Sequence, residues 1–202
     1  NLGDAYVFDN DLPKAALWYR KALFIADSLQ LPKVQNASLY MGLGRIYLLL
    51  EDFEASLNCY QQTEKSFSDL SLNLQAYFLN NYGNYYYYTK DYQTSLKKFL
   101  MLKKLLEKHD KRETFSMYLC KLNLADVYLN LNQLDLSDKC LDEVEDYMRK
   151  NGDETAIYYC NTIRIGQAVK KKDWNTVARI LAGEKSNDQL DFSLLQIRHQ
   201  YL

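Results

Sequence analysis

The sequence has 202 residues, of which 25 are Lys or Arg and 26 are Asp or Glu, and its formal net charge is −1. Nucleic-acid binding normally needs a strongly basic face, so this balance argues against a DNA or RNA partner. Apolar residues make up 48%, too many for a disordered chain. No apolar run reaches the roughly 18 residues that cross a bilayer. We therefore expect no nucleic-acid binding and no membrane insertion by this segment.

Few residues interrupt helices, because the chain has only two prolines and seven glycines. Comparison of the sequence with itself shows one pattern that recurs about every 40 residues, five times in succession. Its clearest marker is an aromatic position, which in chain order reads Tyr6, Tyr47, Tyr86, Tyr128 and, in the weakest copy, Ala168. Repeats of this length are typical of stacked helical units.

Each copy predicts an antiparallel pair of helices. In the first helix, a large residue, a small residue and the aromatic ring share one face, because positions three and four apart are neighbours. Capping residues then interrupt the chain, at Asn10-Asp11, Glu51-Asp52, Lys90-Asp91, Asn132 and Lys172-Asp173. The second helix is predicted to begin at Leu12, Phe53, Tyr92, Leu134 and Trp174. A small residue three positions later lets the two helices approach: Ala15, Ser56, Ser95, Ser137 and, less well, Val177.

The pattern resembles the tetratricopeptide repeat (TPR) family. In the first copy, the family's large, small and aromatic positions are matched by Leu2, Gly3, Tyr6, Ala15, Tyr19 and Ala22. The usual repeat of the family has about 34 residues, so the helices here are longer by about a turn. The resemblance covers most of the chain, although the fifth copy keeps mainly Trp174 and the helix spacing. It implies an all-α fold, a right-handed superhelical α-solenoid of about five antiparallel helix pairs.

The spacing predicts a single TPR-like repeat domain over residues 1–202. The expected repeats are about 1–31, 32–70, 71–110, 111–151 and 152–187, and a further helix starts within 191–202. Repeat arrays need polar caps at their ends, and neither end of this sequence reads as one. We therefore expect a fragment of a longer protein, whose oligomeric state the sequence does not predict.

The stretch NYGNYYYY, residues 81–88, places its rings on different faces of one helix, because successive residues are about 100° apart. Tyr86 falls on the packing face and Tyr85 on its flank. Tyr87 and Tyr88 fall on the opposite face. In the TPR family, this second face of the first helices lines a concave groove that binds partners. The resemblance therefore predicts a partner-binding groove lined by Arg45, Tyr77, Asn80, Asn84, Tyr87, Tyr88, Asn123, Asp126, Asn130, Tyr159 and Thr162.

Tyrosine offers a rigid ring with a hydroxyl, and asparagine offers both a donor and an acceptor, so this lining suits a protein or an extended peptide. The alternative is that the rings only cover the inner surface and stack on one another. One subtype of the family grips a C-terminal carboxylate with lysine, arginine and asparagine. The matching positions here supply Arg45 and Asn84 but no lysine in repeats two to four, so that mode of binding is not expected.

No residue pattern predicts catalysis, a metal site or a cofactor. The cysteines and histidines are not spaced as zinc ligands. They are Cys59, Cys120, Cys140, Cys160, His109 and His199. We expect buried free thiols, which favour a cytoplasmic location, although an extracytoplasmic sensor domain of a membrane-anchored regulator is also compatible. The acidic residues of 142–146 indicate a cation site or a solvated face, and we expect the latter.

These observations predict a protein- or peptide-interaction module without enzymatic activity. Similar long repeats occur in bacterial regulators, so we expect the ligand- or partner-sensing domain of a bacterial regulatory or signalling protein. Two alternatives stay open. One is a structural scaffold or assembly factor without regulated output, and the other is an accessory domain of an enzyme.

Overall fold

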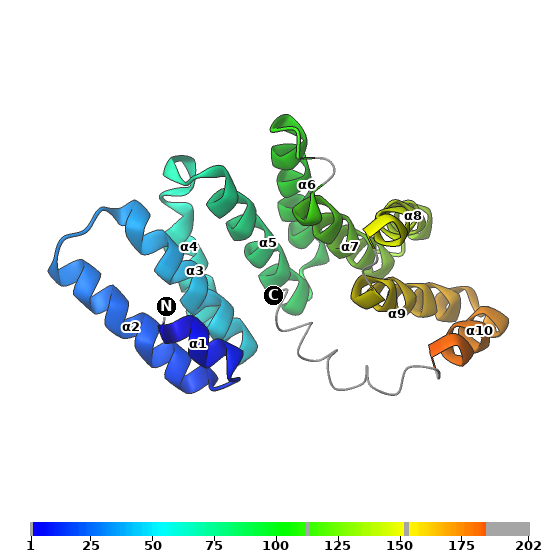
Figure 1. Cartoon of the computed structure of the whole chain (residues 1–202), viewed down its shortest axis with the longest axis horizontal. Coiled ribbons are helices and arrows are strands. Elements are labelled where there is room, and N and C mark those ends of the chain that lie inside the picture. The colour runs from blue at the N-terminus through cyan, green and yellow to red at the C-terminus, as the bar shows by residue number, and fades with distance from the viewer. Residues whose placement is uncertain (1, 112–113, 152–153, 185–202) are drawn as a thin grey trace. The chain divides into compact units, whose positions relative to one another are not determined.

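The computed structural model describes residues 2–111, 114–151 and 154–184, and over these residues the chain is all-α, without a strand. The helix predicted within 191–202 lies outside the described residues. The chain divides into two compact units, one up to Lys90 and one from Asp91, which are described separately (Figure 1). The repeat limits expected from the sequence stay a prediction.

The first unit contains five α-helices and one short 3-10 helix within the described residues. Helix α2 packs against α1 and α3, α4 pairs with α3, and α5 packs against both α3 and α4. The bounds are α1 (Leu2–Phe8), α2 (Leu12–Ser28), α3 (Lys33–Leu49), α4 (Phe53–Glu64), η1 (Phe67–Asp69) and α5 (Leu72–Tyr88).

The second unit is built in the same way. Helix α7 packs against α6 and α8, and α9 packs against α7, α8 and α10. The bounds are α6 (Tyr92–Lys108), α7 (Phe115–Asn130), α8 (Leu134–Asn151), α9 (Glu154–Lys171) and α10 (Trp174–Glu184). The predicted starts of the second helices, from Leu12 in the first repeat to Trp174 in the fifth, are confirmed.

One turn recurs wherever a first helix gives way to a second. A residue with positive φ follows the first helix, and in four of the five turns the N–H of the next residue donates to a carbonyl five positions back, from Asp52 to Tyr47 for example (2.9 Å). This is a Schellman-type helix end, which normally favours glycine. Here the left-handed residues are Asn10, Glu51, Lys90, Asn132 and Lys172, with φ of 58°, 60°, 64°, 60° and 58°.

An aspartate then caps the second helix in four of the five turns. Its carboxylate accepts a hydrogen bond from the backbone N–H three residues on, as Asp91 does from Thr94 (3.0 Å). Hydrogen bonds from Thr94 lower the pKa of the Asp91 carboxyl. The other capping aspartates are Asp11, Asp52 and Asp173. The capping positions read from the sequence are therefore those that the backbone uses.

The small-residue position of the second helices is fully buried in the first four repeats, at Ala15, Ser56, Ser95 and Ser137. Where it is serine, the hydroxyl can bond the facing helix: Ser56 donates to the carbonyl of Gly44 (2.8 Å) and Ser137 to that of Ala125 (2.7 Å). A Cβ at Gly44 would lie 3.1 Å from Cys59 Cβ. The helices therefore meet closely at the positions where the sequence places its smallest residues.

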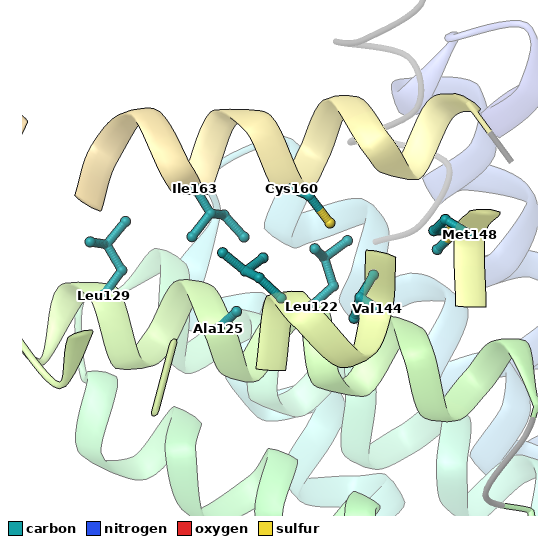
Figure 2. Close-up of a cluster of buried hydrophobic side chains, with 8 residues drawn as sticks. Leu122, Ala125, Leu129, Val144, Met148, Cys160 and Ile163 are labelled. Carbon is teal, nitrogen blue, oxygen red and sulfur yellow. The ribbon is translucent and has the colours of Figure 1, made fainter. Parts of the chain in front are cut away.

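An aliphatic core holds α7, α8 and α9 together (Figure 2). Figure 2 shows Cys160 and Ile163 of α9 facing Leu122 and Leu129 of α7. Packing weakens in the fifth repeat, where Trp174 of α10 is 62% exposed. This loss of burial follows the loss of the sequence pattern in the same repeat.

Candidate partner-binding surface

An aromatic cluster fixes helix α5 against α4. It consists of Tyr60 of α4 and four residues of α5, namely Phe78, Tyr82, Tyr85 and Tyr86. The rings of Tyr60 and Tyr82 stack with centroids 5.3 Å apart, and Tyr86 donates a hydrogen bond from its hydroxyl to that of Tyr82 (3.2 Å). Burial raises the pKa of Tyr82 far above its ordinary value. The Tyr82 and Tyr86 hydroxyls are therefore part of the packing between α4 and α5.

The four consecutive tyrosines, residues 85–88, are distributed between the core and the surface differently from the prediction. Tyr85, expected on the flank, is buried, and its ring lies 5.2 Å from that of Tyr86 in an edge-on arrangement. Two of the four rings are therefore part of the core packing, because the interface with α4 is wide enough to cover the flank as well. Tyr87 and Tyr88 are half-buried and contact each other edge-on, with centroids 5.6 Å apart.

The predicted groove residues of the first unit differ in accessibility. Tyr77 is 39% exposed, and Arg45 is half-buried. Asn80 and Asn84 are buried, at 8% and 6% exposure. Tyr77, with Tyr87 and Tyr88, is therefore the part of the α5 face that a partner can reach most readily, and the two asparagines offer little surface.

Several polar groups of the first unit are enclosed without a hydrogen-bond partner within the described residues. They include Nε of Arg45, the hydroxyl of Tyr60 and both polar atoms of the Asn81 amide. The neighbouring Ser56 hydroxyl donates to the carbonyl of Gly44. The sequence analysis identified neither Tyr60 nor Asn81 as an unpaired group.

The pKa of Tyr60 depends on burial and on the nearby charges. Burial raises the pKa of Tyr60 well above its ordinary value, the Tyr77 hydroxyl raises it further, and the Arg45 guanidinium lowers it. The three residues come from three helices, α3, α4 and α5, of the same unit.

The predicted groove residues of the second unit lie on α7 and α9. Asn123, Asp126 and Asn130 are half-buried, and Asn130 donates from Nδ2 to the carbonyl of Asp126 (2.9 Å). Tyr159 packs against the aliphatic core. Thr162 is exposed, and its hydroxyl donates to the carbonyl of Tyr158 (3.1 Å). The structure thus joins Asp126 to Asn130, and a shared groove for both sets stays a prediction.

The acidic residues of α8 form a solvated face that also carries ion pairs. Arg164 of α9 donates to Glu145 (2.6 Å) and Asp142 (2.7 Å), and Lys121 of α7 pairs with Glu143 (2.7 Å). Burial lowers the pKa of Arg164, but the hydrogen bonds to these carboxylates outweigh it and raise that pKa above its ordinary value. Asp142, Glu143 and Asp146 are exposed, which agrees with the expected solvated face, and neighbouring helices also supply counter-charges to it. Within the described residues, no cluster of His, Cys, Asp and Glu side chains is suited to a metal ion.

All four cysteines are free, and the expected burial holds for Cys59, Cys120 and Cys160, whereas Cys140 is half-buried. Burial raises the pKa of Cys59 and Cys160 to about 12 and that of Cys140 to about 11, and it raises that of Cys120 further. These thiols are protonated at neutral pH and are poor nucleophiles. None of the described helices is both long and apolar enough to cross a membrane.

A second open surface lies at the start of the first unit. A cavity of about 670 Å³ is lined by residues of α1 and α2 and by Leu39 of α3. Its walls are apolar, and Phe24 of α2 is 74% exposed there. Trp18 and Tyr19 also line it, and it lies on other helices than α5, so it serves below as the reference surface in binding experiments.

Comparison with known proteins agrees with this architecture. Residues 37–63, which cover most of α3 and α4, match the family described as tetratricopeptide repeat. None of the curated proteins compared with the chain matches it.

Solved structures share the fold at low sequence identity. A chain of nearly identical TPR-like repeats, assigned as a kinesin light chain of Podosopora anserina, has a TM-score of 0.71 and 11% identity, covering 93% of this chain and 94% of its own. Aspartyl phosphate phosphatase F from Bacillus subtilis has a TM-score of 0.72 and 14% identity, covering 98% of this chain and 52% of its own. A Rap protein complexed with competence and sporulation factor has a TM-score of 0.72 and 15% identity. The match covers 98% of this chain and 54% of the Rap chain.

The repeated helix pairs and the shared fold define a chain of stacked helical repeats. One of these repeats, over residues 37–63, matches the tetratricopeptide repeat model, and the fold is similar to that of TPR-like repeats. The chain spans about half the length of the phosphatase F and Rap chains, and nearly the full length of the Podosopora anserina repeat chain.

Proposed function

We propose that this chain is the partner-sensing repeat domain of a bacterial regulatory protein, and that its ligand is a peptide or an extended protein segment bound along α5. The observation that carries the proposal is the accessible tyrosine surface of α5, formed by Tyr77, Tyr87 and Tyr88. Tyrosine is enriched at binding hot spots, because its rigid ring buries a large area at small entropy cost and its hydroxyl can bond a peptide backbone.

The Rap protein complexed with competence and sporulation factor supports this proposal. Its fold matches nearly all of the present chain, and its structure contains a bound factor. Regulators with this repeat type therefore combine the fold with ligand recognition. Because the present chain spans only about half of that protein, the proposal concerns recognition alone, and any output would depend on other parts of the molecule.

A structural scaffold is the second candidate. The Podosopora anserina chain of TPR-like repeats supports it, because it matches this chain over nearly the full length of both. A scaffold would bind a folded partner through a broad surface and would show no preference for short peptides. We further propose that the chain has no catalytic activity of its own, in keeping with thiols that stay protonated at neutral pH.

A peptide-binding experiment tests the proposal. A pool of random octapeptides is incubated with the immobilised chain, bound peptides are identified by mass spectrometry, and their Kd is measured by fluorescence polarisation. Tyr77→Ala should weaken binding by about tenfold or more, since loss of a central ring at a hot spot costs at least about 1–2 kcal/mol. It should leave the melting temperature almost unchanged, because Tyr77 is the most exposed ring of α5.

The matched control is Phe24→Ala, which removes an exposed ring from the reference surface on α2. It should leave peptide affinity unchanged. Equal losses in both variants would indicate nonspecific hydrophobic binding and would contradict the proposed surface. If no peptide is retained, the scaffold candidate replaces the sensor.

A further inference from the structure

Four exposed positions of helix α6 form a stripe along one face. They are Lys97, Leu100, Met101 and Lys104, whose spacing of three and four residues places them on the same side of the helix. We call these four residues the α6 stripe. Leu100 is 42% exposed and Met101 is 49% exposed, so an apolar pair lies in the middle of the stripe with a lysine at each end.

The equivalent positions of α4 are polar and bond one another. One repeat earlier, the four positions are Asn58, Gln61, Gln62 and Lys65. Gln62 donates to the Asn58 side chain (3.2 Å), and Lys65 donates to the Gln62 side chain (2.8 Å). The helix α4 therefore pairs its own polar groups at these positions and exposes no large apolar residue there.

The equivalent positions of α8 are charged, and neighbouring helices supply partners for them. One repeat later, the four positions are Lys139, Asp142, Glu143 and Asp146. Asp142 pairs with Arg164 of α9, and Glu143 pairs with Lys121 of α7, both at 2.7 Å. The α6 stripe differs from both, because its middle is apolar and its ends carry charge of one sign.

The charge on α6 is unbalanced. The helix contains five lysines and one glutamate, and that glutamate, Glu107, already pairs with Lys103 (2.7 Å). Lys97, Lys104 and Lys108 form no ion pair with another described residue. Lys104 and Lys108 are both exposed and lie four positions apart, where like charges repel each other. Acidic groups brought by a partner would relieve this repulsion.

We propose that the α6 stripe docks an acidic amphipathic helix of a partner protein. Carboxylates on this helix pair with Lys97 and Lys104, and apolar residues between them cover Leu100 and Met101. The charge of the stripe argues for an acidic partner, because a surface of one sign attracts and orients a surface of the opposite sign. The stripe belongs to α6 of the second unit, so the inference does not depend on a peptide bound along α5.

The chemistry of the stripe favours a helix over an extended peptide. The backbone groups of α6 bond one another within the helix, and the side chains of the stripe offer ammonium donors but no oxygen acceptor for a peptide N–H. A second helix presents its side chains at the same three- and four-residue spacing, so it can match the stripe side chain by side chain. An anionic membrane is a poorer match, because helices that bind membranes bury a longer apolar face than one leucine and one methionine.

The experiment uses a labelled, alanine-rich helical peptide of about 16 residues as the probe. Two leucines lie on one face of this peptide, and glutamates flank them one turn away on the same face. A comparison peptide has the same composition, with its glutamates on the opposite face. Fluorescence polarisation measures the Kd of each peptide for the intact chain. The first peptide should bind about tenfold more tightly or better, because only its face matches the stripe.

Two pairs of substitutions locate the binding on α6. The double variant Lys97→Glu/Lys104→Glu should lower the affinity of the first peptide by about tenfold or more, because it places like charges against each other. Leu100→Ala/Met101→Ala should also lower it by about tenfold, because it removes the apolar contact. The matched control is Arg20→Glu/Lys21→Glu, which makes the same change in charge at exposed positions of α2 and should leave the affinity unchanged.

Charge exchange gives the strictest form of the test. A peptide with lysines in place of the glutamates should bind Lys97→Glu/Lys104→Glu and should not bind the wild type. Tyr77→Ala should leave the affinity of the acidic peptide unchanged, so failure of the α5 proposal and failure of this one are distinguishable.

Three results would overturn the inference. One is equal affinity for the two acidic peptides, which would show attraction by net charge alone. Another is the absence of binding up to about 1 mM peptide. The third is binding of phosphatidylserine vesicles that depends on Lys97 and Lys104 while the peptide does not bind, which would assign the stripe to a membrane surface.

Discussion

The two units of the molecule use the same repeat and differ in how some of their buried polar groups are paired. In the second unit, Arg164 is matched by Glu145 and Asp142, and Gln167 donates to Ser137 (2.8 Å). In the first unit, Arg45, Tyr60 and Asn81 have enclosed polar atoms without partners among the described residues.

This difference distinguishes polar groups that are paired within the protein from polar groups that are not. Enclosing an unpaired polar group costs about 1–3 kcal/mol, so a protein keeps such groups only where something else offsets the loss. The paired network of α8 and α9 needs no ligand. Of the unpaired groups, those of Tyr60 and Asn81 lie in the core, at 0% and 1% exposure, and only Arg45 is half-buried.

The largest expected effect concerns Tyr60. Tyr60→Ala should lower the free energy of unfolding by about 3–5 kcal/mol, because it removes a ring that contacts Phe78, Tyr82 and Tyr85. Leu141→Ala, at the same repeat position in the second unit, should cost about 2–5 kcal/mol. Urea denaturation followed by circular dichroism measures both.

The substitution Tyr60→Phe measures the contribution of the hydroxyl alone to stability. It should be neutral or stabilising, since the hydroxyl is enclosed without a partner and its removal breaks no bond. A loss above about 1.5 kcal/mol would show that the hydroxyl is paired in solution and would remove the contrast between the units.

The second effect compares the two arginines. Arg164→Met should destabilise the chain by about 1–2 kcal/mol at low salt, because it leaves Glu145 and its neighbours without their counter-charge. Arg45→Met should change stability by less than about 0.5 kcal/mol or increase it, because no ion pair is lost.

Repeating the stability measurements at low and high salt concentration makes the comparison of the two arginines more specific. The effect of Arg164→Met should shrink when the ionic strength rises, since part of the network is exposed and is screened. Denaturation midpoints in low and high NaCl give the comparison. Equal destabilisation by both substitutions would mean that Arg45 has a partner within the protein, and the contrast between the two arginines would be lost.

The sequence was sufficient for the architecture because the repeat encodes it locally. The capping aspartates, the small residues at Ser56 and Ser137 and the start of each second helix all follow from nearest-neighbour chemistry, and the structure confirms them. Five copies of one pattern also reduce the chance that a single accidental match misleads.

The candidate site was predicted less completely, because burial and pairing depend on neighbours that are remote in sequence. Helical angles alone placed Tyr85 on a flank, whereas the width of the α4 interface buries it. They also placed Asn84 on an open face, although it is buried. Asp4 and Arg45 occupy the same repeat position, but only the structure shows that Tyr19 donates a hydrogen bond to Asp4.

The smallest expected effect tests the turn that both units share. Glu51 of the first unit and Asn132 of the second both have φ of 60°, a conformation that costs a residue with a Cβ about 1–2 kcal/mol. Both side chains are exposed. Glycine relieves that strain but also gains freedom in the unfolded chain, so Glu51→Gly should stabilise by a few tenths to about 1 kcal/mol. Asparagine tolerates this region better than glutamate, so Asn132→Gly should gain less.

Thermal denaturation of the two glycine variants and the wild type shows which substitution gives the larger gain in stability. A larger gain at Asn132 than at Glu51 would show that backbone strain is not what limits these turns. Destabilisation by Glu51→Gly would indicate that the Glu51 side chain contributes to the end of α3. The expected order would instead show that the two units differ in how they pair polar groups and agree in how they turn the chain.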